Sequence, residues 1–390
     1  MKKIILTVLT IGLAAALPSA RTQEINIEHS GNYFGQKPIP IALSGFTGEG
    51  AEVLKFDLTV QGFSFVSPDA AQYLVSGSDS GAVTGSLTDK FAKRVLFSHS
   101  YNGASLRRQA HALADDIVQA VTGKNGIGQT KIAYKVQPTG YGAGEIYVAD
   151  FDGANAQRVT TDNAIVAKPA WVPGHLALYY TSYALGNPDI FYHSLTTGQR
   201  RKVAAYSGLN TSAAVSPAGA RIAMVLSKSG SDNIWTCNAD GTGLKQITFG
   251  VEDSSPTWSP DGNWICFATK DNSRRRLAKV PAGGGSVQTL DTRGTPNPTE
   301  PDWSPDGKWI AFTSQMGDFN ICVAPADGSA PPVVLATGQN PSWAPNSRTL
   351  VYNHHATGYR QVLSVLDVFT KQYKDCVRAT GNSSQPAWAK

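Results

Sequence analysis

From about residue 129 onward, the chain alternates short apolar runs with clusters of turn-forming residues. In the segment 301–336, one predicted strand ends at Ser304 and three more cover 309–314, 319–324 and 333–336. Pro-Asp-Gly and Asp-Gly sequences separate these strands, and they favour tight turns because proline presets φ and glycine accepts positive φ. Four strands joined by short turns predict an antiparallel meander.

One phrase recurs through this region. It reads Pro-Asp-Trp-Ser-Pro-Asp-Gly-Lys-Trp-Ile-Ala-Phe at 301–312, and 256–267 repeat it almost residue for residue. Weaker copies centre on four other positions: Trp171, Val215, Trp343 and Trp388. Consecutive copies lie 40 to 45 residues apart, which is typical of one four-stranded propeller blade per repeat.

The ends of the repeat region predict a closed ring. Residues 131–136, 145–151 and 157–160 resemble the second, third and fourth strands of a blade without a first strand, whereas 386–388 resemble a first strand with nothing after it. Pairing these segments completes a sixth blade and removes open sheet edges. The predicted propeller, at 129–390, is therefore all-β, six-bladed and closed by a C-terminal strand.

Residues 23–128 have a different pattern, typical of a small N-terminal α/β domain. The predicted elements are strands at 38–46, 63–67 and 73–76, a helix at 50–61, a hairpin at 82–98 and a helix at 105–121. Ser105 can cap the last helix and Gly123 ends it, and its apolar stripe is expected to pack on the sheet. Four of its polar residues are expected to face solvent: Arg107, Arg108, Asp115 and Asp116. The glycine-rich stretch 123–128 favours a hinge over a rigid joint.

Residues 1–20 are typical of a secretory signal peptide. Lys2 and Lys3 precede an apolar run at 4–17 that is too short to span a bilayer stably, and small residues follow it. This pattern predicts export to the periplasm of a bacterial host and a protein that does not span the membrane. The formal charge of +5 falls to +3 without the two lysines, too small and dispersed a charge to indicate nucleic-acid binding.

The cysteines and histidines do not suggest a metal site. All four cysteines fall in the repeats: Cys237, Cys266, Cys322 and Cys376. An oxidising compartment would permit disulfides, but three of the cysteines interrupt apolar strands, which favours buried free thiols. No cysteine pair has zinc-ligand spacing, and His354 and His355 are adjacent strand residues that point to opposite faces. No cofactor is expected.

Candidate catalytic residues have structural interpretations. Residues 77–81 carry Asp79 where a nucleophile elbow needs serine, so a serine hydrolase is not indicated. Asp261 and Asp306 lie in Pro-Asp-Gly turns, where a carboxylate bonds local backbone amides. His111 is interpreted as a packing or hydrogen-bonding residue. Three tryptophans recur with the blade period and are expected to pack between blades: Trp258, Trp303 and Trp343. We expect a protein that is not an enzyme.

The junction of the two predicted domains carries a specific sequence. It comprises Leu-Arg-Arg-Gln-Ala-His-Ala-Leu-Ala-Asp-Asp-Ile at 106–117, Val-Thr-Gly at 121–123, Gly126 and Thr-Lys-Ile-Ala-Tyr at 130–134. This junction closely resembles that of TolB proteins, and 38–46 and the Trp-Ser-Pro-Asp-Gly copies resemble the same family. The resemblance implies a periplasmic component of the Tol-Pal system that supports outer-membrane integrity and cell division. It also implies binding of the lipoprotein Pal by the propeller and of TolA by the N-terminal segment.

Partner binding is expected on the propeller face formed by the interblade loops, because these loops differ from blade to blade. Each loop delivers one residue to the channel mouth, and these residues are Lys168, Ser212, Ser255, Glu300, Asn340 and Gln385. Longer loops add Asn210, Glu252, Asp253, Asn297 and Thr299. We predict that a monomer docks a folded protein here, Pal by resemblance. The alternatives are a solvated polar rim, a secreted propeller that binds or hydrolyses glycans or oligopeptides in its channel, and an envelope scaffold of a divergent TolB-like type with other partners.

Overall fold

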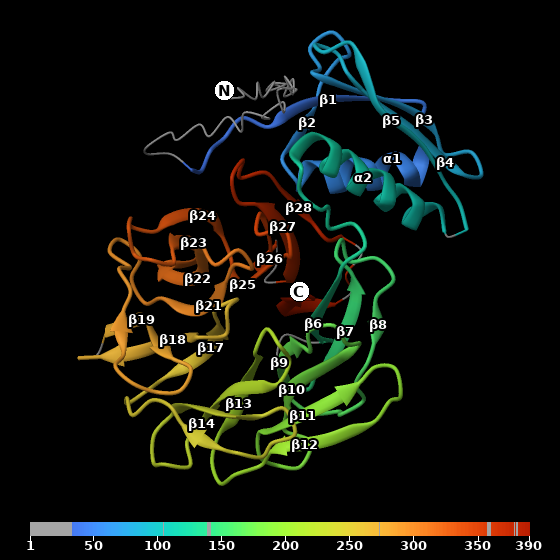
Figure 1. Ribbon diagram of the computed structural model, residues 1–390. Helices are drawn as coiled ribbons and strands as arrows, with labels where there is room; N and C mark the ends of the chain where they lie inside the picture. Colours follow the sequence, from blue (N-terminus) through green and yellow to red (C-terminus); the bar gives the residue numbers. More distant parts are fainter. Residues whose placement is uncertain are drawn as a thin grey trace, which may run out of the picture. The chain divides into compact units, whose positions relative to one another are not determined.

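The computed structural model describes residues 33–390 except 104, 139–141, 273, 357–359, 378 and 380. The predicted signal peptide and the N-terminal segment that the resemblance assigns to TolA binding lie outside these residues. Phe34–Lys390 form one compact unit that contains a mixed α/β part followed by a six-bladed β-propeller (Figure 1). The predicted fold class is confirmed, and the boundary between residues 128 and 129 stays a prediction.

The α/β part is a five-stranded sheet with two helices on one face (Figure 1). The strand order is β2-β1-β3-β4-β5; β1 pairs in parallel with β2 and β3, whereas β4 is antiparallel to β3 and β5. All the predicted elements of this part are present. Their bounds are β1 Ile39–Ser44, α1 Gly48–Thr59, β2 Phe63–Phe65, β3 Tyr73–Ser78, β4 Val83–Asp89, β5 Arg94–Tyr101 and α2 Leu106–Thr122.

Helix α2 has the predicted caps and apolar stripe. The Ser105 hydroxyl accepts a hydrogen bond from the Arg108 amide at 3.3 Å, and Gly123 ends the helix at a φ of 70°. The stripe residues Ala110, Leu113 and Ile117 are fully buried against the sheet. Capping and the 3.6-residue period therefore fix this helix in the way the sequence predicts.

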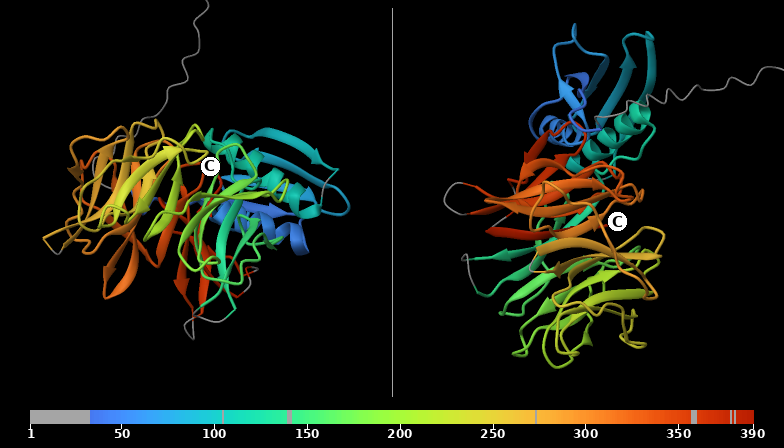
Figure 2. Two further views of the ribbon diagram at one scale, coloured as in Figure 1. Left: turned by 90° about the horizontal axis from the view of Figure 1, so that it is seen from below. Right: turned by 90° about the vertical axis from the view of Figure 1, so that its left-hand side faces the viewer.

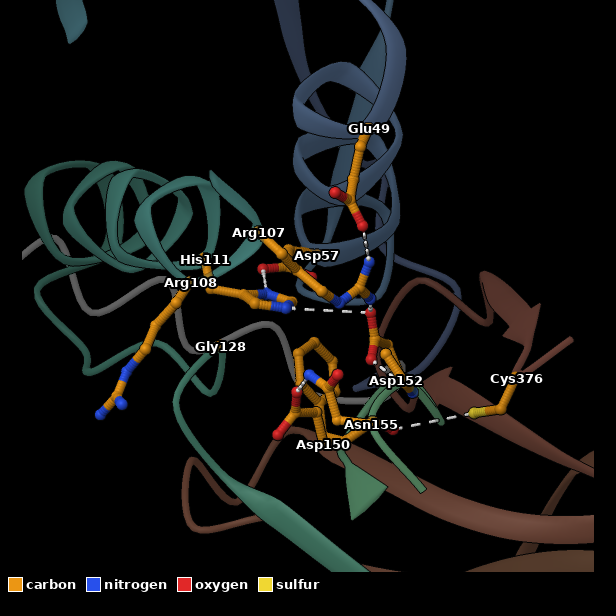
Figure 3. Close-up of polar contacts among 12 residues, drawn as sticks. Glu49, Asp57, Arg107, Arg108, His111, Gly128, Asp150, Asp152, Asn155 and Cys376 are labelled. Atoms are coloured by element: carbon orange, nitrogen blue, oxygen red, sulfur yellow. Dashed lines mark hydrogen bonds and ion pairs between the residues drawn. The ribbon is translucent and has the colours of Figure 1, made fainter. Parts of the chain in front are cut away.

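Polar residues of α2 connect the α/β part to the propeller (Figure 3). Arg107 was expected in solvent, but it is buried because its guanidinium pairs with Asp152 in a propeller turn. His111 Nδ1 lies 2.6 Å from the buried carboxylate of Asp57 in α1, which confirms its hydrogen-bonding role. Burial raises the pKa of Asp57, and the nearby His111 and Arg107 oppose this shift.

The linker between the two parts is anchored, unlike the expected hinge. Ile127 is fully buried with residues of the propeller core, and the half-buried Asp115 accepts a hydrogen bond from the Gly128 amide at 2.7 Å. Burial raises the pKa of Asp115 to about 7, although the Gly128 bond opposes this change. Asp115, like Arg107, is therefore part of the junction rather than of the solvated helix surface.

Each propeller blade is a four-stranded antiparallel meander, and Figure 2 shows the blades from two further directions. Five blades are continuous in sequence. They are β9 Val166–Trp171, β10 Ala177–Ser182, β11 Asp189–Ser194 and β12 Arg200–Ala204; β13 Asn210–Val215, β14 Arg221–Leu226, β15 Asn233–Asn238 and β16 Lys245–Gln246; β17 Ser254–Trp258, β18 Trp264–Asp271, β19 Arg274–Pro281 and β20 Gln288–Thr289; β21 Thr299–Trp303, β22 Trp309–Met316, β23 Asp318–Pro325 and β24 Val333–Thr337; β25 Gln339–Trp343, β26 Thr349–His355, β27 Gln361–Asp367 and β28 Tyr373–Asp375.

The sixth blade is made from both ends of the propeller sequence, as predicted. Its strands are β29 Asn382–Trp388, β6 Lys131–Gln137, β7 Glu145–Asp150 and β8 Gln157–Arg158, in that order. Trp388 in β29 is only 2% exposed; its indole donates to the Thr130 hydroxyl at 2.8 Å and stacks on Phe151 at 5.8 Å between ring centroids. Both backbone pairing and aromatic packing thus close the ring.

The aspartates of the repeated phrase stabilise turns. The Asp306 carboxylate accepts hydrogen bonds from the Lys308 amide at 3.1 Å and the Ser304 hydroxyl at 2.6 Å. Asp261 accepts equivalent bonds in the preceding blade. These local bonds lower the pKa of Asp261, the serine hydroxyl bond most. The structural interpretation of both carboxylates is confirmed.

The tryptophans of the phrase pack between blades, which confirms their predicted role. Trp258 and Trp343 are buried, and their indoles donate to the carbonyls of Ala214 and Asp302 in the preceding blade at 3.0 and 3.1 Å. Trp303 also packs against the preceding blade, but its indole bonds the Gly307 carbonyl of its own turn at 3.1 Å.

The cysteines, His354 and the helices were also subjects of predictions from the sequence. All four cysteines are buried and free, so the interpretation as free thiols is confirmed. His354 Nε2 lies 3.2 Å from Asp375. Among the described residues, no helix is long and apolar enough to cross a membrane.

Replacing Trp388 tests closure. Trp388→Ala removes a buried indole that joins the ends of the propeller, so we expect it to lower the free energy of unfolding by about 3–5 kcal/mol. Val377→Ala is the control, because Val377 is 82% exposed and should change stability by less than about 0.5 kcal/mol. Urea unfolding measures both. Equal stability of the two variants would contradict a closing role for Trp388.

Candidate functional site

Each first strand of the propeller contains an irregularity where the chain passes the channel. The pairing register between the first and second strands shifts in every blade. One residue at each shift has a φ between 51° and 56°, a left-handed conformation uncommon outside glycine. The six predicted mouth residues occupy this position: Lys168, Ser212, Ser255, Glu300, Asn340 and Gln385. We call this set the channel ring.

Side chains of the channel ring meet across the channel. Lys168 Nζ lies 2.8 Å from Glu300 Oε1 and 2.9 Å from Asn340 Oδ1, and the lysine and glutamate side chains are 26% and 21% exposed. Burial alone would raise the pKa of Glu300, but the Lys168 charge and hydrogen bonds from Lys168, Thr313 and Asn340 lower it. Glu300 is therefore a fixed anion at neutral pH.

The left-handed backbone of the ring is held by side chains of the preceding blade. The Lys168 amide donates to Gln385 Oε1 at 2.9 Å, and the Asn340 amide donates to Glu300 Oε2 at 3.1 Å. The Gln385 amide donates to Asn353 Oδ1 at 3.2 Å. A strained conformation persists only where its surroundings determine it, and these bonds supply that restraint.

A cavity of about 380 Å³ occupies the channel. The channel ring lines one end, and the first strands and the Ser-Pro turns line the rest, with buried Trp171, Trp258, Trp303 and Trp388 in the walls. Lys390 Nζ lies 2.7 Å from Asp302 in the same lining. The cavity thus combines apolar walls with paired charges. The period of the Trp-Ser-Pro phrase identifies these tryptophans in the sequence, but it did not predict that they line the cavity.

The five predicted loop residues do not line this cavity. Asn210 is fully buried and bonds the Tyr206 amide and carbonyl at 2.9 and 2.7 Å, so it stabilises its own loop. Asp253 is also buried and accepts from the Thr269 hydroxyl at 2.6 Å. Burial of a hydrogen-bonded polar group is common where a loop needs a fixed shape.

The other three loop residues are more accessible. Glu252 lies 2.7 Å from Lys270 Nζ, and the Lys270 hydrogen bond lowers its pKa most. Asn297 is exposed with a φ of 49°, and Thr299 begins β21 half-buried. The structure therefore groups the six ring residues and leaves the loop residues outside the cavity.

The propeller agrees with a known family. Residues 118–390 match the model described as PD40, the TolB beta propeller domain. The chain belongs to the TolB family. This membership confirms the resemblance that the junction sequence and the repeated phrase indicate.

Two curated relatives of this TolB-family chain are named Tol-Pal system protein TolB. The protein from Anaeromyxobacter dehalogenans (strain 2CP-C) is 29% identical over 269 residues, covering 57% of this chain and 60% of the relative. The protein from Anaeromyxobacter sp. (strain K) is 29% identical over 267 residues with the same coverage. The aligned region thus spans 60% of the length of these relatives.

A solved structure supports the same fold. The crystal structure of TolB from Acinetobacter baumannii superposes with a TM-score of 0.80 and 23% identity, covering 91% of this chain and 98% of that one. The structure of putative TolB from Agrobacterium tumefaciens superposes with a TM-score of 0.52 and 18% identity, covering 63% and 87%.

The ionic bond of the TolB-family ring is testable by a double-mutant cycle. Lys168→Met leaves the Glu300 carboxylate without its cation, so we expect a loss of about 1–2 kcal/mol of unfolding free energy at neutral pH. Adding Glu300→Gln should recover part of this loss. Urea unfolding measures each variant.

The pH dependence of the unfolding free energy tests whether Glu300 stabilises the fold as an anion. Because the pKa of Glu300 is lowered in the folded state, its contribution is present above the ordinary glutamate pKa and is lost as the pH falls through the lower folded value. We expect the wild type and Glu300→Gln to converge in stability well below about pH 4. Additive losses for Lys168→Met and Glu300→Gln would contradict the pairing.

Proposed function

We propose that this chain is a non-enzymatic periplasmic component of the Tol-Pal system that binds a Pal-like peptidoglycan-associated lipoprotein through its propeller. Family membership and the names of its relatives support the system. The observation that carries the binding site is the channel cavity, which places six equivalent side chains at the end of an apolar-walled hollow. Concave sites with apolar walls and a few fixed polar groups suit an inserted segment of a partner.

The arrangement of the ring gives this site two unlike sides. Following the blade order, Ser212 and Ser255 lie between Lys168 and Glu300 on one side, and the amides of Asn340 and Gln385 lie on the other. Small hydroxyl side chains leave more room than amides that bond their neighbours. We therefore place the inserted segment over the serine side, with hydrogen bonds to the Lys168–Glu300 pair.

The electrostatics favour binding over acid–base catalysis. A general acid needs a pKa near the working pH, but the pKa of Glu300 is lowered. The other charged pair in the lining, Lys390 with Asp302, also holds its groups in ionic bonds. Fixed charges of this kind provide specificity for a partner rather than proton transfer.

The five predicted loop residues belong to the same proposed interface. Asn210 and Asp253 hold their interblade loops by hydrogen bonds, and we include Glu252, Asn297 and Thr299 in the proposed interface as residues of the interblade loops. Binding of a TolA-like protein is proposed for the N-terminal segment before residue 33. The proposed assembly contains one copy of this chain and neither nucleic acid nor a cofactor.

Calorimetric titration with the Pal-like domain encoded by the same genome tests the propeller site. Glu300→Lys reverses a charge of the ring, and Asn340→Trp fills the channel. Each is expected to weaken binding at least about tenfold, because the first breaks a half-buried charge pair and the second blocks the pocket. Asp69→Lys is the matched control, because Asp69 is an exposed acid of the α/β part.

The outcomes separate the alternatives. Unchanged affinity in both ring variants, with folding intact by circular dichroism, would remove the ring from the interface. Binding of peptidoglycan fragments without any binding of the Pal-like domain would support the glycan or peptide alternative instead. Equal weakening by Asp69→Lys would show a non-specific charge effect.

A further inference from the structure

A second and larger cavity, of about 670 Å³, lies outside the channel where α2 meets the sixth blade. Its lining comes from the first turns of α2, the linker, β6, β7 and β8, and from the neighbouring blade. Figure 3 shows part of this junction, with Arg108 directed away from the buried cluster around Arg107 and Asp152. The proposed channel interface uses none of these residues.

The lining of the junction cavity carries excess positive charge. Arg107, Arg108, Lys131 and Arg158 contribute cations, and Asp150 is the single carboxylate in the described lining. Lys131 Nζ lies 2.9 Å from Asp150, so these two charges compensate each other. Arg108 Nε bonds the neutral amide of Gln129 at 3.2 Å, and the exposed Arg158 has no ion-pair partner in the described part of the chain. Two arginines therefore remain uncompensated.

The N-terminus of α2 strengthens this potential. Its first turn has Arg107 and Arg108 but no acidic residue, although the positive end of a helix dipole disfavours cations. Arg107 is compensated by Asp152 and by Glu49 at 3.5 Å. Arg108 has no such partner among the described residues. An anion bound beside it would therefore compensate both the arginine charge and the positive end of the helix dipole.

A buried histidine also borders the lining of the junction cavity. His111 is 2% exposed and its Nδ1 is bonded to Asp57, but its Nε2 has no hydrogen-bond partner in the described structure. The nearest carboxylate oxygen, of Asp152, is 3.9 Å away and too far for a hydrogen bond. The imidazole therefore faces the buried Asp152 carboxylate, and the exposed Arg108 and Arg158 are the cations that a ligand in the cavity can reach.

One border of the junction cavity is an open sheet edge. Strand β8, Gln157–Arg158, is last in the order β29-β6-β7-β8 and pairs with β7 alone among the described strands. Backbone groups on its other edge can pair with an added extended strand. Side chains of such a strand alternate, so one set would face the arginines and the other the apolar Leu176 and Leu195.

We propose that the junction cavity binds an extended acidic peptide segment of another protein. The segment pairs with β8, and its carboxylates contact Arg108 and Arg158. The volume exceeds that of a single small ion and lies within the usual range of ligand pockets. Asp150 in the lining disfavours a compact dianion such as phosphate, whereas carboxylates spaced along a strand can avoid it.

The probe is a blocked ten-residue peptide of alternating glutamate and threonine, titrated against the full chain by fluorescence anisotropy. We expect saturable binding that weakens with added salt. Arg108→Gln combined with Arg158→Gln should weaken it roughly tenfold, because both uncompensated cations are removed. Arg274→Gln combined with Lys374→Gln is the matched control, since both are exposed cations in other blades, and it should bind as the wild type does.

Three results would overturn the proposal. They are equal binding of the same peptide with glutamine in place of glutamate, unchanged binding by the arginine double variant, and binding of succinate or inorganic phosphate at this site without binding of the peptide. The last result would indicate a small-anion site. Glu300→Lys should leave peptide binding unchanged, so failure of this proposal and failure of the channel interface are distinguishable.

Discussion

Five register pairs between β29 and β6 join residues from opposite ends of the propeller, and the rest of the fold is organised around this pairing. The aromatic contact that closes the ring also belongs to a larger core. Trp388 and Phe151 pack in one apolar cluster with Val60 from the end of α1 and Ile127 from the linker. Because the same cluster closes the ring and holds the α/β part, loosening either one exposes apolar surface of the other.

Closure also determines the geometry of the channel. Lys168 and Gln385 are 217 residues apart in the sequence. Their hydrogen bond exists only because β29, which contains Gln385, lies beside the blade that begins with β9. The left-handed conformation of Lys168, Glu300 and Asn340 costs energy that each residue recovers through bonds to neighbouring blades. The ring is consequently a property of the closed propeller, and a single blade could not maintain it.

Local chemistry explains why the elements could be predicted. Pro-Asp-Gly turns, the Ser105 cap and the strand period each act within a few residues, so they predicted the blades, α2 and even the missing strand. The buried state of Arg107 depends on Asp152, and the Lys168–Glu300 contact joins residues 132 apart, so no local pattern reveals either. Lysine, serine and glutamate do not favour positive φ, so the sequence did not predict the left-handed backbone at the channel ring.

Helix α2 shows how one short segment can serve several surfaces. Its stripe packs on the sheet, Arg107 and His111 face the propeller junction, and Arg108 remains on the border of the second cavity. The Trp-Ser-Pro-Asp-Gly phrase reverses the chain beside an interblade tryptophan, which any propeller blade requires. The segment 106–134 is specific to this architecture, because it contains the last helix of the α/β part, the linker and the start of the incomplete blade. Its residues are therefore constrained by contacts with both parts of the protein, whereas those of a turn phrase are constrained by the propeller alone.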